Sequence, residues 1–241
     1  MIIKTKHFYK KKYTKKGLRV SNYFVNFECG KKSDYSAQNK LKTMEDLKNI
    51  DLLSIDRNWL LPEAGRILIS KPFSGDEYFD KSIVYITESN EKGTVGFILN
   101  KPVLTHLDMQ HGGAKTGSWN LWFGGPVRSD YIYFIHTAGP DIIPGSIKVA
   151  DGIYWGGDFN LVSQKIENGE LNEKAVRFFL GYSGWEKDQL EREINEKFWM
   201  VGKLDASIIM NTDADVWKEA VKNLGVRYRL WENLPPDPLL N

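Results

Sequence analysis

The sequence predicts an α+β domain in which helices cover a curved, largely antiparallel sheet. Two observations carry this prediction. From residue 58 onward, short apolar runs alternate with glycine and proline, a pattern typical of strands separated by turns. Helix signals concentrate after residue 157, where apolar residues recur at helical spacing between charged ones.

The first part of this region supplies most of the predicted strands. Their runs are rich in β-branched and aromatic residues, which favour a pleated sheet over a helix. They are Arg66–Ser70, Ser82–Glu88, Gly93–Leu99, Asn120–Phe123, Tyr131–His136 and Gly152–Tyr154. Between the second and third runs, Asn90-Glu-Lys-Gly93 predicts a hairpin turn, because glycine accepts a positive φ.

The second part begins with a helix and a strand. Asp158 is expected to cap a helix over Phe159–Glu167, and Gly169 is expected to end it. A strand over Val176–Tyr182 follows.

Two further helices with a strand between them complete the expected elements. The first helix carries one apolar stripe, formed by Leu190, Ile194 and Phe198 at four-residue spacing. Residues Ala206–Met210 are expected to form the strand. The last helix is expected to start near Thr212, with Asp215 as a capping-box-like partner, and its buried face and end are then Val216, Trp217, Ala220, Val221, Leu224 and Gly225.

Charge divides the chain into two unequal parts. Residues 1–43 hold 12 Lys and Arg against Glu28 and Asp34, a net charge of +10, whereas residues 44–241 hold 21 basic and 29 acidic residues, a net charge of −8. All eight tryptophans lie between Trp59 and Trp231. We therefore expect residues 1–43 to form a basic, disordered extension, and residues 44–241 to form a single domain with one sizeable core.

Two features of composition bear on the compartment. The chain has no apolar run of 18 or more residues, and no apolar stretch follows the basic N-terminus, so neither a membrane span nor a secretory signal is expected. The single cysteine, Cys29, excludes an intramolecular disulfide and a multi-cysteine metal site. The expected location is therefore the cytoplasm.

Four separated motifs closely resemble those of the AlgH family of bacterial proteins, also called YqgE. They are Gly93-Thr-Val-Gly-Phe-Ile-Leu-Asn-Lys-Pro102, Trp122-Phe-Gly-Gly-Pro-Val127, Phe179-Leu-Gly-Tyr-Ser-Gly-Trp185 and the stretch Glu191–Trp199. The resemblance runs from about Leu60 to Gly225 and implies a bifurcated sheet folded into a pseudo-barrel. Members are described as uncharacterised proteins or as candidate transcriptional regulators with no agreed reaction, so the resemblance implies regulation rather than a specific chemistry.

Three interpretations of residues 1–43 stay open at this point. The segment is an arm that binds nucleic acid or anionic lipid, a solvated tail, or an upstream stretch wrongly joined to the gene. The last interpretation follows from Met44-Glu-Asp-Leu, which resembles the ordinary beginning of family members.

Motifs for catalysis are near misses. A phosphate loop needs glycine directly before its lysine, but Ala114 precedes Lys115, and a nucleophile elbow needs glycine two residues after the serine, where Trp185 follows Ser183. His106 and His111 near Asp108 would make at most a weak metal site and are better interpreted as solvated loop residues. We therefore expect no catalytic residue, no metal and no cofactor, although enzyme activity stays open.

The glycine motifs have a structural and a functional interpretation. Gly124-Gly125-Pro126 is expected to turn the chain tightly at the sheet edge. In the functional interpretation, charged and polar side chains converge beside the turn and form a small pocket for an anion or carboxylate. The residues of this candidate pocket are Asn100, Lys101, Gly124, Gly125, Arg128, Tyr182 and Trp185, the last two serving either as lining or as packing.

Two function classes follow. In the first, the protein is a regulatory module that acts through a protein partner, because a domain at −8 without a helix-turn-helix pattern argues against direct, specific DNA binding. In the second, the pocket beside the glycine turns binds a small anionic ligand.

Overall fold

The computed structural model describes residues 18–20, 23–25, 55, 60–111, 114–150, 152–225 and 228–234. Within the basic extension, β1 (Leu18–Val20) and β2 (Tyr23–Val25) pair antiparallel in a sheet of their own. The rest of residues 1–43 lies outside the described residues, so the expectation that this extension is disordered stays a prediction.

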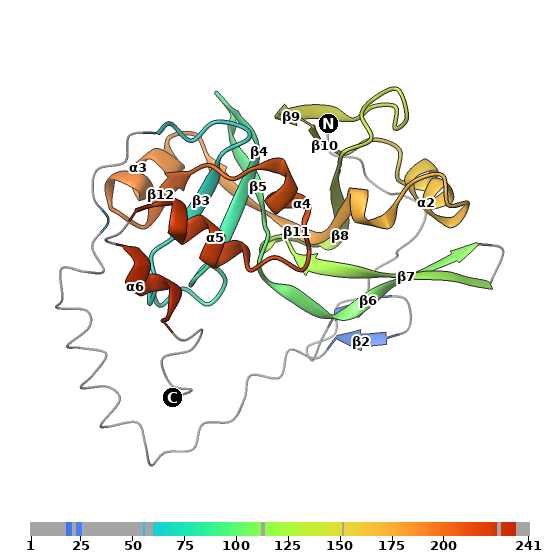
Figure 1. Cartoon of the computed structure of the whole chain (residues 1–241), viewed down its shortest axis with the longest axis horizontal. Coiled ribbons are helices and arrows are strands. Elements are labelled where there is room, and N and C mark those ends of the chain that lie inside the picture. The colour runs from blue at the N-terminus through green and yellow to red at the C-terminus, as the bar shows by residue number, and fades with distance from the viewer. Residues whose placement is uncertain are drawn as a thin grey trace, which may run out of the picture.

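A single ten-stranded sheet forms the body of the domain (Figure 1). The strands follow the order β12-β3-β4-β5-β11-β8-β10-β9, and β7 branches from β11 and carries β6 on its other side. The strands are β3 (Ile67–Ser70), β4 (Ile83–Asn90), β5 (Gly93–Ile98), β6 (Pro102–His111), β7 (Ala114–Phe123), β8 (Val127–His136), β9 (Ile147–Ala150), β10 (Ile153–Trp155), β11 (Val176–Glu186) and β12 (Trp199–Gly202). The β7–β11 pairing is parallel, and the other pairings are antiparallel.

The sheet divides at β11. Residues Val176–Leu180 of this strand pair with β8 on one side and, at Phe178–Leu180, with β7 on the other, whereas Ser183–Glu186 pair with β5. Gly181 lies between the two parts at φ 71°, next to a register shift against β8. This bend lets one strand serve two diverging halves, as the predicted bifurcated sheet requires.

The two outer parts of the sheet curl toward each other. A Cβ added at Gly65, just before β3, would lie 2.8 Å from the Cβ of Ala150 in β9. No strand pairing joins β3 to β9 in the described part of the chain, so the sheet is curved but not closed. The α+β class and the curved, largely antiparallel sheet are therefore confirmed.

Short helices cover both faces of the sheet (Figure 1). The helices are α2 (Phe159–Glu167), α3 (Gln189–Asn195), α4 (Ala206–Met210), α5 (Val216–Asn223) and α6 (Arg229–Glu232). Because side chains alternate along a strand, β3 contributes to two cores: Ile67 and Ile69 join the core under α4, α5 and α6, and Leu68 joins the core under α3. A third core lies beneath α2 and includes Phe134, Phe159 and Phe178.

Several predicted elements are confirmed. Asp158 accepts hydrogen bonds from the backbone N–H groups of Asn160 and Leu161, and the helix α2 that it caps spans the expected residues. The hairpin between β4 and β5 turns before Gly93, whose φ is 137°. The strands expected before Ala206 are present, although β7, β8 and β11 are longer than expected.

Three predictions about the C-terminal part were wrong. Ala206–Met210 is the helix α4 and not a strand. The helix with the apolar stripe ends at Asn195, because Lys197 adopts a φ of 63°, and Phe198 is exposed before the unexpected strand β12. The last helix begins at Val216 with Asp215 as its N-cap, not near Thr212. The strands β6 and β9 and the helix α6 were not expected, and β6 contains the histidines assigned to a loop.

Candidate functional site

The glycine motifs bring backbone from three strands into close contact. The Gly124 N–H donates to the Leu180 carbonyl at 2.9 Å, and its own carbonyl accepts from the Ile98 N–H at 3.0 Å. An added Cβ at Gly124 would lie 2.3 Å from the Gly181 carbonyl oxygen, and one at Gly125 would lie 2.4 Å from the Ser183 nitrogen. These glycines are therefore needed for the approach of the strands to β11.

Ser183 takes part in the same contact. Its side chain is fully buried, and its hydroxyl donates to the Gly124 carbonyl at 3.0 Å. This position is consistent with a structural serine and offers no approach for a substrate.

Asn100 and Lys101 face the loop before β4. The Asn100 side chain accepts from the Ile83 N–H at 2.9 Å and donates to the Lys81 carbonyl at 2.8 Å. The Lys101 ammonium donates to the Tyr78 carbonyl. Burial lowers the pKa of Lys101, and the carboxylates of Asp80, Asp76 and Glu77, in that order, act in the opposite direction. Both polar heads thus stabilise this loop, and the surroundings of Lys101 are acidic.

Arg128 is the second residue of β8, just beyond the glycine turn. Its side chain is exposed, its φ is 48°, and its guanidinium lies 5.6 Å from the centre of the Tyr131 ring. Within the described residues, no hydrogen bond or ion pair joins Arg128 to Asn100 or Lys101.

The two aromatic residues of the candidate pocket have different surroundings. Tyr182 is half-buried and meets Tyr133 edge to face at 5.5 Å, beside Gly125. Trp185 is buried, and its indole N–H donates to Glu193 at 2.8 Å. The same carboxylate oxygen of Glu193 accepts from the Trp199 indole at 2.8 Å, which fixes α3 against the sheet.

The candidate pocket is therefore only partly assembled. Gly124, Gly125 and Tyr182 lie together, and Trp185 packs under α3. Whether the turn region binds an anion stays a prediction.

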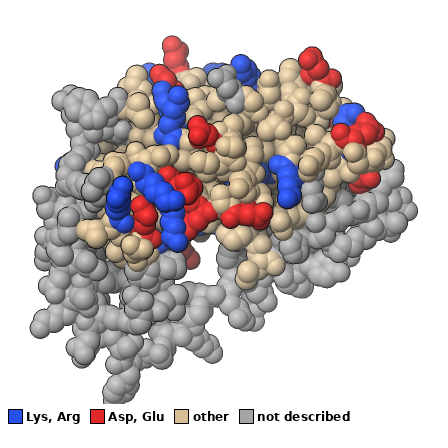
Figure 2. Space-filling model, viewed as in Figure 1, with Lys and Arg blue, Asp and Glu red and all other residues tan. Residues whose placement is uncertain are grey.

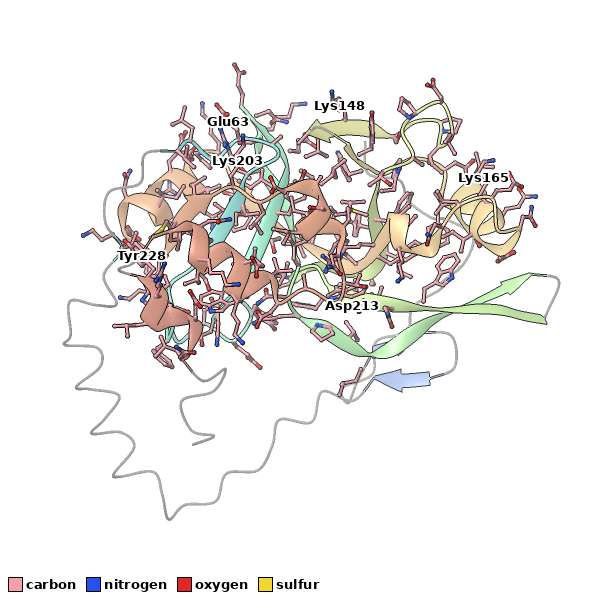
Figure 3. The ribbon with its side chains drawn as sticks, in the orientation of Figure 1. Glu63, Lys148, Lys165, Lys203, Asp213 and Tyr228 are labelled. Carbon is pink, nitrogen blue, oxygen red and sulfur yellow. The ribbon has the colours of Figure 1, made fainter. Side chains whose placement is uncertain are left out.

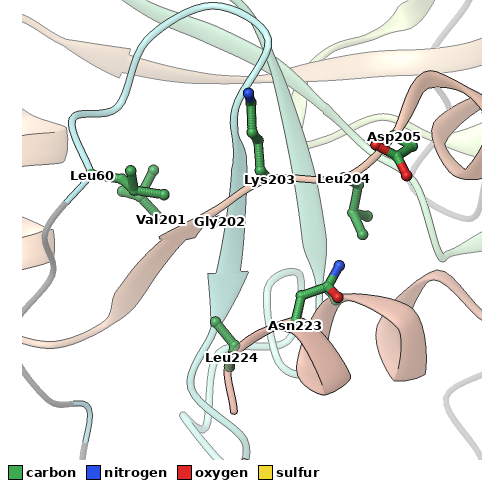
Figure 4. Close-up of a pocket in the computed structure, with 9 residues that line it drawn as sticks. Leu60, Val201, Gly202, Lys203, Leu204, Asp205, Asn223 and Leu224 are labelled. Carbon is green, nitrogen blue, oxygen red and sulfur yellow. The ribbon is translucent and has the colours of Figure 1, made fainter.

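A groove that sequence reasoning did not find lies between β12 and α5 (Figure 4). Its volume is about 450 Å³, and its lining combines an apolar floor with a polar rim. The lining residues are Leu60, Val201, Gly202, Lys203, Leu204, Asp205, Ala220, Asn223 and Leu224. In Figure 4, Leu204 and Asn223 point toward each other across the groove, and Leu60 lies beside Val201. Residues 203–205, between the expected helix that ends near Phe198 and the strand expected at Ala206–Met210, carried no motif, so no sequence signal marked the groove.

Tyr228 is the N-cap residue of α6 and lies beside that helix in Figure 3. The Tyr228 ring meets Trp231 edge to face at 4.9 Å within this segment, and Trp231 in turn stacks on Trp217 of α5 at 6.5 Å, which holds the short α6 against the domain.

Besides the groove, the buried Arg177 is a feature that the sequence did not indicate. This β11 side chain is 1% exposed. Its guanidinium donates to the carbonyl of Ile209 and, at 2.7 Å, to that of Leu99, and it lies 4.7 Å from the centre of the Trp122 ring. Burial lowers the pKa of Arg177 to about 10, so the side chain is charged at neutral pH.

Two kinds of feature are absent from the described residues. No group of three or more His, Cys, Asp or Glu side chains is placed to hold a metal ion in that part of the chain. Among the helices of the described ranges, none is both long and apolar enough to cross a membrane.

Comparisons with protein families and with known sequences agree on the family of this chain. The AlgH-like family profile matches residues 67–229. A UPF0301 protein of Parabacteroides distasonis is 40% identical over 200 residues, which cover 82% of this chain and 100% of the relative. A UPF0301 protein of Bacteroides thetaiotaomicron is 38% identical over 194 residues, which cover 79% of this chain and 97% of the relative.

Two solved structures share the fold. The solution structure of the AlgH protein from Pseudomonas aeruginosa matches with a TM-score of 0.58 at 24% identity and covers 74% of this chain and 98% of that protein. A crystal structure of a protein from Corynebacterium diphtheriae matches with a TM-score of 0.57 at 19% identity and covers 75% of this chain and 95% of that protein.

Proposed function

This chain belongs to the AlgH-like family, and from that premise we propose that it is a non-catalytic regulatory module that binds a protein partner in the groove between β12 and α5. Through that partner it regulates transcription without specific contact to DNA. One observation carries the proposal: the groove runs beside the last strand of the sheet.

The position of β12 favours an extended segment as the bound part of the partner. β12 pairs with β3 on one side and has no strand on its other side among the described residues. Because all four residues of β12 are buried, an extended peptide would lie along the neighbouring groove, which selects its alternate side chains, rather than pair with the strand.

The lining of the groove specifies the chemistry of that segment. Val201, Leu204 and Leu224 provide an apolar floor for one or two aliphatic side chains. Lys203 and Asp205 at the rim are exposed and of opposite charge, so they favour a segment with flanking charges of both signs.

Charge supports a partner other than DNA. Residues 44–241 carry a net charge of −8, and on the face in Figure 2 acidic and basic side chains are interspersed. Two such pairs lie on or next to α5, Lys218 with Asp215 at 3.5 Å and Lys222 with Glu219 at 2.7 Å. Backbone phosphates bind surfaces of predominantly positive charge, which this arrangement does not provide.

Site-specific crosslinking in native cells tests the proposal. A photo-crosslinking residue at Lys203 or Asn223 should capture one protein that the same residue at Lys218, exposed on α5, does not capture. Binding of that purified protein should then weaken at least several-fold in Lys203→Glu and Asn223→Arg, and not in Lys218→Glu. Equal capture from all three positions, or unchanged binding by both groove variants, would contradict the proposal.

A small anionic ligand at the glycine turn is the second candidate function. The exposed Arg128 guanidinium, held above Tyr131 next to the Gly124–Gly125 backbone, supports it. In a metabolite screen by thermal shift, a ligand of this site should stabilise the parent and the groove variants but not Arg128→Ala or Lys101→Ala. If both charge variants keep their stability and respond to every ligand as the parent does, the turn region is not the site.

A further inference from the structure

The interior of the curved sheet contains polar groups that have no partner within the described residues. They are Arg177 Nε, the hydroxyls of Tyr85 and Tyr133, and Trp155 Nε1. The side chains of all four are more than nine-tenths buried. Burying such a group without a hydrogen bond costs about 1–3 kcal/mol, so several together require an explanation.

These groups belong to one region of the core. Tyr85, Tyr133 and Trp155 are members of a single hydrophobic cluster that also contains Phe97, Trp122 and Phe179. The Phe97 ring lies 5.8 Å from Tyr133, 6.3 Å from Trp155 and 4.8 Å from Phe179, centre to centre. Phe97 is also the register partner of Tyr85, and Phe179 lies 5.7 Å from the Arg177 guanidinium.

The charge of Arg177 is not compensated by a carboxylate in the described part of the chain. Its two terminal nitrogens donate to the carbonyl oxygens of Ile209 and Leu99, and Trp122 and Phe179 present ring faces to it. These contacts are dipolar and leave a net positive charge in the core. A buried charge without a counter-charge is costly, which favours uptake of an anion.

The unpartnered groups also favour an anion over water. Arg177 Nε and Trp155 Nε1 can only donate, and burial raises the pKa of Tyr85 and Tyr133, so both hydroxyls keep their protons. A water molecule could accept from Arg177 Nε and donate to a tyrosine oxygen, but it would leave the Arg177 charge uncompensated, whereas an anion accepts from these donors and compensates that charge. We propose that this part of the core binds one small monovalent anion of halide type, beside Arg177.

Crystals of the full chain grown with bromide provide the direct test. We expect an anomalous bromine peak within hydrogen-bond distance of Arg177 Nε and of at least one of the other three donors. Electron density beside Arg177 that gives no anomalous signal, or no electron density there at all, overturns the proposal.

Solution measurements with matched variants provide the second test. When bromide replaces gluconate at constant ionic strength, the melting temperature of the parent should rise with bromide concentration, because an anion that binds the folded state stabilises it. Tyr85→Phe and Tyr133→Phe remove single hydroxyls without changing ring packing, and they should weaken the apparent bromide affinity several-fold. Arg177→Met should abolish it if that variant folds.

Tyr154→Phe is the control for these substitutions, because Tyr154 lies outside the cluster and stacks on His136 at 5.8 Å. It should respond to bromide as the parent does. An identical bromide response in the parent and in all three tyrosine variants would show a general salt effect and overturn the proposal.

Discussion

Gly125 shows how closely a single residue is constrained by its neighbours. Its φ is 148°, and an added Cβ would lie 2.4 Å from the Tyr182 carbonyl carbon and from the Ser183 nitrogen. The residue therefore combines a backbone conformation that favours glycine with a contact that leaves no space for a side chain. The packing role of this motif is clear from geometry alone.

Gly125→Val should consequently destabilise the protein by at least about 1–3 kcal/mol through backbone strain, with an added cost from the clash. Gly75→Val is the matched control, because Gly75 has a φ of 78° but no atom within 4 Å of an added Cβ. Chemical denaturation of both variants separates strain from clash. Equal losses of stability would mean that the close contact with β11 relaxes at little cost.

His136 links stability to pH. The ring is fully buried, its Nε2 lies 3.1 Å from the Gly156 carbonyl oxygen, and burial lowers its pKa from 6.5 to about 4. Below pH 6.5 the unfolded chain binds a proton at this site and the folded chain does not, so stability is lost as the pH falls from 6.5 to about 4. Over this range the loss is on the order of 3 kcal/mol.

His136→Phe keeps an aromatic ring and removes the titration. Between neutral pH and pH ~4.5, the denaturation midpoint should fall less in this variant than in the parent. An equal fall in both proteins would assign the acid sensitivity to carboxylates instead.

At the scale of elements, the sequence predicted correctly those turns and caps that local interactions determine. It predicted wrongly those segments whose secondary structure depends on tertiary contacts. The Asp158 cap and the β4–β5 hairpin depend on short-range hydrogen bonds and on glycine conformation, and both were predictable. Ala206–Met210 has a β-branched pair, yet it forms a helix that buries Ile209 and Met210 against the core.

The C-terminal end of α3 and the start of β12 show the same limit. Four-residue spacing extended the expected helix to Phe198, but Lys197 reverses the chain and all four residues of β12 are buried. The groove beside β12 depends on this reversal, so it could not be predicted from sequence. The glycine turn could be predicted, but the burial of Arg177 could not, because its acceptors Ile209 and Leu99 are distant in the chain.

The cap of α5 provides a prediction at this scale. The Asp215 side chain accepts from the Lys218 N–H at 3.1 Å, so Asp215→Ala should cost about 1 kcal/mol of stability. Asp213→Ala, an exposed residue two positions earlier, should change stability by less than about 0.5 kcal/mol. Denaturant titration compares the two, and a larger loss in Asp213→Ala would contradict the assignment of the cap.

At the scale of the whole molecule, the basic extension is expected to be independent of the fold. Its net charge of +10 disfavours the apolar burial that offsets chain entropy of about 1–2 kcal/mol per residue. Removal of residues 1–43 should leave the melting temperature nearly unchanged. In a separate gel-retardation measurement, the shortened chain of residues 44–241 should not retard promoter DNA at physiological salt. A loss of more than a few degrees, or sequence-specific DNA binding by the shortened chain, would contradict these expectations.

The shared strand β11 has a consequence for synthesis on the ribosome. Both halves of the sheet require it: β5 pairs with its C-terminal part, and β7 and β8 flank its N-terminal part. Neither half can complete its hydrogen bonding until residue 186 has left the exit tunnel, although β3, β4 and β5 emerge long before. The nascent chain must therefore carry an unpaired edge on β5 while residues 99–186 are translated, a period in which chaperone binding would protect it from aggregation.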